Sequence, residues 1–131
     1  MDFNLQNIED YTRDLAWMLK AMAQVEKEFQ TENWTLIKPI NPDTAYAEII
    51  EQVQPLLNEM LLEKGAAYCN QLLYKIDISE RQIAKSVARQ VDMSFSEILS
   101  ELIVRRCLQK VLIRNYYKSP EKDALGNSLK E

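Results

Sequence analysis

The sequence contains no histidine among its 131 residues. Histidine is the most common general base, the most common metal ligand and the usual partner of a catalytic serine or cysteine. Its absence removes the enzyme classes that depend on it, although carboxylates, lysine and tyrosine remain as acids and bases. We therefore expect a protein that is not an enzyme and that needs no cofactor or metal.

Glycine and proline are scarce, with two and four residues respectively. The glycines, Gly65 and Gly126, stand alone, so no glycine-rich loop exists to hold a phosphate. So few turn residues favour long helices over β-architecture. No apolar run approaches the roughly 18 residues that a membrane span needs, and the polar, acidic N-terminus is unlike a signal peptide.

The two cysteines, Cys69 and Cys107, form no CxxC motif and lie in apolar helical surroundings. A free cysteine in such a place usually acts as a small core residue. We expect two unreactive thiols, no disulfide and a cytoplasmic protein.

What is present indicates an all-α fold. Hydrophobic residues make up 47% and charged residues 27% of the chain, the balance of a globular protein. We predict a small four- or five-helix bundle with a long N-terminal helix and a buried C-terminal helix. Residues 1–118 would form one domain, and residues 119–131, which lack periodicity, a flexible tail.

A long helix is predicted over residues 4–32, where apolar residues recur with alternating spacings of three and four. This stripe consists of Ile8, Tyr11, Leu15, Met18, Met22, Val25 and Phe29. Trp17 lies on the opposite, polar face. It would serve a partner or pack under the following loop, and we favour the loop.

The next helix is predicted to begin with Asn41 as its N-cap and Pro42 in its first turn, after a connection tucked in by Trp34, Leu36 and Ile37. Pro55 should kink or break this helix, because proline removes a backbone donor and crowds the preceding turn. For Gly65 we favour a continuous helix in which the glycine lets a neighbour approach closely, over a helix end at this residue.

Two helix starts are marked by capping boxes, in which an N-cap serine and the residue three positions later bond each other's backbone. Ser79 with Gln82 predicts a short helix over about 80–91. Ser94 with Glu97 predicts a final helix from Phe95, after a three-residue turn. This final helix is apolar nearly all round, so it should be covered by the other helices or by a second subunit. Arg106 falls within its apolar surface and needs a carboxylate partner.

Charge is unevenly distributed. Residues 1–74 hold 5 basic and 12 acidic side chains, a net of −7, whereas residues 75–118 hold 9 and 5, a net of +4. This division and the apolar final helix favour a protein-interaction or self-associating module, most simply a homodimer. Its interaction surface would include Trp17 and three cations of the short helix: Arg81, Lys85 and Arg89.

An alternative is a divergent helix-turn-helix DNA-binding regulator formed by residues 79–106. Against it, the turn is about three residues too long, and the helix that would read bases opens with Phe95, Glu97 and Ile98. Acidic side chains repel the DNA backbone, and large apolar ones are better core residues than base readers.

A second alternative is a small-ligand site in a buried polar pocket lined by Tyr68, Tyr74, Asp77 and Arg106. Tyrosines at helical spacing more often fill the edge of a core and bond their hydroxyls locally. The glutamate pairs of residues 48 and 51, and 59 and 63, lie beside the apolar stripe, and a di-iron bundle would need histidine as well. We expect these glutamates to be solvated.

Overall fold

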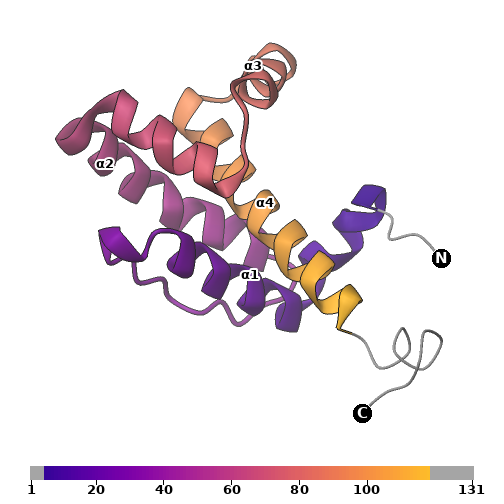
Figure 1. Ribbon diagram of the computed structural model, residues 1–131. Coiled ribbons are helices and arrows are strands. Elements are labelled where there is room, and N and C mark those ends of the chain that lie inside the picture. Colours follow the sequence, from indigo (N-terminus) through magenta and orange to yellow (C-terminus); the bar gives the residue numbers. More distant parts are fainter. Residues whose placement is uncertain (1–4, 119–131) are drawn as a thin grey trace.

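The computed structural model describes residues 5–118, which form helices and connecting segments without any strand (Figure 1). The elements are the 3-10 helices η1 (Leu5–Arg13) and η2 (Gln30–Glu32) and the α-helices α1 (Leu15–Glu28), α2 (Ala45–Ile76), α3 (Glu80–Arg89) and α4 (Phe95–Tyr117). The predicted all-α bundle is confirmed. The predicted tail over 119–131 lies outside the described residues.

Helix α4 forms the centre of the core, packed against both α1 and α2. Its buried residues are Ile98, Leu99, Ser100, Ile103, Val104, Cys107, Leu108, Val111 and Leu112. The prediction of a buried C-terminal helix is therefore confirmed. The cover comes from helices of the same chain, so α4 does not need a second subunit to bury it.

The N-terminal stripe does face the core, but the helix predicted over residues 4–32 is divided. A 3-10 helix ends at Arg13, and α1 begins after Asp14, whose carboxylate accepts a hydrogen bond from the Trp17 backbone amide at 3.3 Å. An aspartate at this position stabilises a new helix start in preference to a helix interior. Periodicity alone did not reveal the break, because the apolar spacing runs across it.

The connection from η2 to α2 packs only partly against the helices. Trp34 stacks on Phe29 with ring centroids 4.0 Å apart, and Leu36 is buried, but Ile37 is 78% exposed, contrary to prediction. The start of α2 is also later than predicted. Asn41 caps a turn by accepting from the Asp43 amide at 2.9 Å, and the helix begins at Ala45.

The break in α2 occurs at Gly65 and not at Pro55. Gly65 has φ 87° and ψ 167°, and a side chain built there would meet no atom within 4 Å. Both parts of that prediction are thus wrong: the helix kinks, and no neighbour approaches closely. Pro55 lies on the exposed side of α2, as does Glu51, whose carbonyl has no N–H of residue 55 to accept from.

Side chains join α1 to α4 through a connected polar network. The Lys110 ammonium donates to Glu28 at 2.7 Å, and the Gln24 amide donates to the same carboxylate at 2.8 Å. Arg114 then donates to the amide oxygen of Gln24 at 3.1 Å. These pairs place the two helices antiparallel, with residue 24 opposite residue 114.

Candidate functional site

Helix α3 is formed by strong local signals at each end. The capping box of Ser79 and Gln82 is present, and that of Ser94 and Glu97 opens α4. Both predicted boxes are therefore confirmed. The helix ends at Arg89, two residues earlier than predicted, and residues 90–94 connect it to α4.

This helix projects from the bundle, as its end-on view in Figure 1 shows. Of its ten residues, Ser86 alone is buried. The outward face is apolar: Ala84 and Ala88 are exposed and Val87 is 40% exposed, while Val91, in the segment after the helix, is 81% exposed. Spacings of three and four residues make the three positions of the helix one stripe.

The cations of α3 lie beside this stripe. Arg81, Lys85 and Arg89 are all exposed, and within residues 5–118 none of them forms an ion pair. Lys85 and Arg89 also line a cleft of about 250 Å³ between α3 and α4. The predicted interaction surface is thus brought together on α3, except for Trp17.

The α4 wall of this cleft carries Arg105 and Arg106, which do have carboxylate partners. Arg105 donates to Glu9 of η1 at 3.1 Å. Arg106 donates to Asp77 at 2.8 Å and to the carbonyl oxygen of Ile76 at 3.4 Å. The need of Arg106 for a carboxylate was predictable from its position, whereas the role of Arg105 depends on a contact 96 residues away and had no local signal.

Asp77 ends α2 in a left-handed conformation, with φ 77° and ψ 43°. Its ion pair with Arg106 links α4 to the point where the chain leaves the bundle to enter α3. Asp77 and Arg106 are the two members of the predicted polar pocket that the structure brings together.

The two tyrosines of the predicted pocket lie elsewhere. Tyr74 is 82% exposed on α2. The Tyr68 hydroxyl donates to Glu32, whose carboxylate also pairs with Lys64 at 3.2 Å. The Tyr68 hydrogen bond, followed by the Lys64 contact, lowers the pKa of Glu32 against the opposing effect of burial. This cluster joins η2 to the kink of α2 and is separate from the Asp77–Arg106 pair.

Trp17 packs within the N-terminal segment. Its ring meets Tyr11 of η1 edge-on, with centroids 5.8 Å apart, and the Lys20 ammonium lies 4.6 Å above it. Its ring partners thus come from η1 and α1, and the favoured packing under the following loop is replaced by packing against the preceding 3-10 helix.

The remaining chemistry of the described residues is sparse. Cys69 and Cys107 are free and buried, and burial raises the pKa of the Cys107 thiol to about 12. Within residues 5–118, no group of three or more cysteines and carboxylates could hold a metal ion, and no helix is long and apolar enough to cross a membrane.

The helix-turn-helix alternative requires α4 to enter a DNA groove. Nine residues of α4 are buried, including Ile98 and Leu99 in its first turns. A helix so committed to the core presents few side chains to bases, and the alternative stays a prediction that would have to rely on α3.

Comparison of the chain with protein-family models, with curated proteins and with solved structures finds no match.

Proposed function

We propose that this protein is a non-enzymatic protein-interaction module that forms a homodimer, with α3 of one copy docked on the outer face of α2 in the other. One observation carries the proposal. Helix α3 has an exposed apolar stripe beside three cations that have no ion-pair partner in residues 5–118. Such a surface fits an acidic helix with apolar residues of its own.

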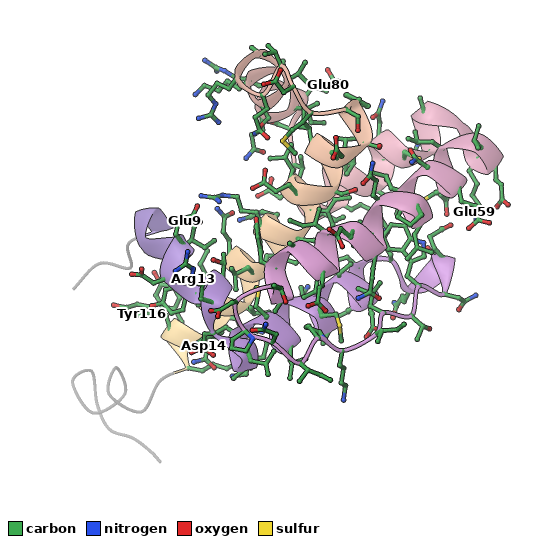
Figure 2. All side chains as sticks on the ribbon, turned by 180° about the vertical axis from the view of Figure 1, so that it is seen from behind. Glu9, Arg13, Asp14, Glu59, Glu80 and Tyr116 are labelled. Atoms are coloured by element: carbon green, nitrogen blue, oxygen red, sulfur yellow. The ribbon has the colours of Figure 1, made fainter. Side chains whose placement is uncertain are left out.

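The outer face of α2 has the complementary character. Leu62 is 88% exposed, and the exposed residues near it include Glu51, Pro55, Asn58, Glu59 and Glu63, with the exposed Lys64 directly after them. Figure 2 places Glu59 at one corner of the molecule and Glu80, at the start of α3, at another. The two faces are thus apart within one chain and free to meet between two chains.

The spacing of charges on the two faces also matches. Arg81 and Arg89 are eight residues apart, about 12 Å along a helix, and Glu51 and Glu59 have the same separation. Each copy carries both faces, so two copies related by a two-fold axis make the contact twice. The two free, buried thiols support a reducing compartment, and we place the dimer in the cytoplasm.

The test is the mass in solution, measured by light scattering over a range of protein concentrations. We expect the unchanged chain to be a dimer. Arg81→Glu/Arg89→Glu should be monomeric, because its α3 now repels α2 of a second copy. Glu51→Arg/Glu59→Arg should be monomeric for the converse reason. An equimolar mixture of the two variants should recover the dimer mass, since each α3 again meets an α2 of opposite charge.

The control is Lys38→Glu/Lys75→Glu, which changes the net charge as much as the α3 variant but at exposed positions outside both faces. It should remain dimeric. A monomeric unchanged chain at all concentrations contradicts the proposal, and so does a mixture of the two charge-reversed variants that stays monomeric.

A further inference from the structure

A groove of about 360 Å³ lies between α1 and α4, on the side of α4 that faces away from α3. Its floor includes Gln24 and Val111, both buried. Its rim holds four cations, Lys20 and Lys27 from α1 and Arg114 and Lys118 from the end of α4. The lining, as far as residue 118, contains no carboxylate.

The charge of this groove is not cancelled by its neighbours. The adjacent carboxylate, Glu28, already accepts hydrogen bonds from Lys110 and Gln24. Within residues 5–118, Lys20, Lys27 and Lys118 form no ion pair. Four like charges therefore converge on one groove of a chain whose net charge is −4.

Helix dipoles explain only part of this arrangement. Cations are favourable in the last turn of a helix, which accounts for Lys27 and Arg114. Lys20, in the middle of α1, instead lies 4.6 Å from the centroid of the Trp17 ring, a contact that does not neutralise its charge. Arg114 lies in the last turn of α4 and Lys118 follows the helix directly, so two like charges lie at this end of the groove.

One of the cations is held in place. Arg114 donates to the amide oxygen of Gln24 at 3.1 Å, and the Gln24 amide nitrogen is fixed in turn by Glu28. A guanidinium has five N–H donors, so most of those on Arg114 stay available to oxygen atoms of a ligand. The flanking lysines supply mobile point charges, a combination suited to phosphate groups.

We propose that this groove binds a small free anion that carries two or more phosphate groups. Its volume lies at the low end of that of small-molecule sites, which fits a compact ligand. The site is independent of the α3 docking surface, because it is formed by α1 and the end of α4.

The test is isothermal titration calorimetry of the full chain with sodium tripolyphosphate, at an ionic strength held constant with sodium chloride. Lys20→Gln/Lys27→Gln should weaken binding about tenfold or more, because it removes two charge-assisted contacts. Lys118→Gln, on the opposite wall, should weaken it as well. Lys38→Gln/Lys75→Gln removes the same charge elsewhere and should leave the affinity within about twofold.

Two further probes separate the sources of phosphate. Vesicles that contain phosphatidylglycerol present lipid phosphates, and duplex DNA presents a polymer. Binding of tripolyphosphate that both groove variants weaken and the control does not supports the proposal. Absence of tripolyphosphate binding, equal loss in the control, or groove-dependent binding of vesicles or DNA alone overturns it.

Discussion

Helices α3 and α4 follow one another and begin with the same device, a serine capping box, yet they differ in every later respect. Helix α4 buries nine residues against α1 and α2, whereas α3 buries Ser86 alone. Local signals thus start both helices equally well, and long-range packing decides their roles. The chain buries the surface of α4 by itself and leaves most of α3 exposed, the surface on which the proposed dimer contact rests.

The largest expected loss of stability comes from a substitution in α4, whereas a comparable substitution in α3 should have little effect. Leu108 is fully buried, and Leu108→Ala should lower the free energy of unfolding by about 2–5 kcal/mol, since it leaves a cavity in the core. Val87→Ala, on the exposed face of α3, should cost less than about 0.5 kcal/mol in protein dilute enough to be monomeric. Urea denaturation of both variants measures the difference. Similar losses would mean that α3 is as much part of the core as α4.

Gly65→Ala tests the kink of α2, the second helix that packs on α4. A β-carbon at Gly65 would meet no atom within 4 Å, but the φ of 87° and ψ of 167° at this residue are accessible almost only to glycine. We expect the variant to lose about 1–3 kcal/mol of stability through backbone strain alone. Denaturation without any loss would show that α2 does not kink here.

The junction between the bundle and α3 is tested at Asp77. Asp77→Asn removes the ion pair with Arg106 but tolerates the left-handed conformation, so it should cost about 0.5 kcal/mol. Asp77→Ala loses both features and should cost about 1–2 kcal/mol. If the two variants unfold at the same urea concentration, the left-handed conformation is not the important feature.

A pH-dependent effect tests the contact between η2 and the kink of α2. The pKa of Glu32 is lowered in the folded state, mainly by the Tyr68 hydrogen bond. Its contribution to stability is present above the unfolded pKa and is lost as the pH falls through the folded pKa. Tyr68→Phe should cost about 1 kcal/mol at neutral pH.

The same variant should make the acid loss of stability shallower, because the folded pKa of Glu32 then lies nearer its unfolded value. Denaturation at neutral pH and at successively lower pH measures this slope. An unchanged slope in Tyr68→Phe would assign the acid sensitivity to other carboxylates.

The sequence predicted those features that local chemistry determines. The two capping boxes, the burial of α4 and the carboxylate partner of Arg106 all follow from residue types at short spacing or from the cost of an unpaired buried charge. The break at Asp14 was missed because a 3-10 helix followed by an α-helix preserves the apolar spacing.

The candidate sites were only partly predictable. Arg81, Lys85 and Arg89 share a helix, so their grouping could be read from the sequence. The exposure of the apolar stripe beside them depends on how α3 leaves α2 and could not be read in this way. The groove between α1 and α4 joins residues about 90 positions apart, such as Gln24 and Arg114, and becomes visible only once the two helices are known to be antiparallel.

The most direct test of the difference between α3 and α4 is amide hydrogen exchange at low and at high protein concentration. The account predicts that amides of residues 80–89 exchange quickly in dilute protein and become protected as dimers form, while those of α4 are protected throughout. Protection of α3 that does not change with concentration, or protection of α4 that does, would contradict it.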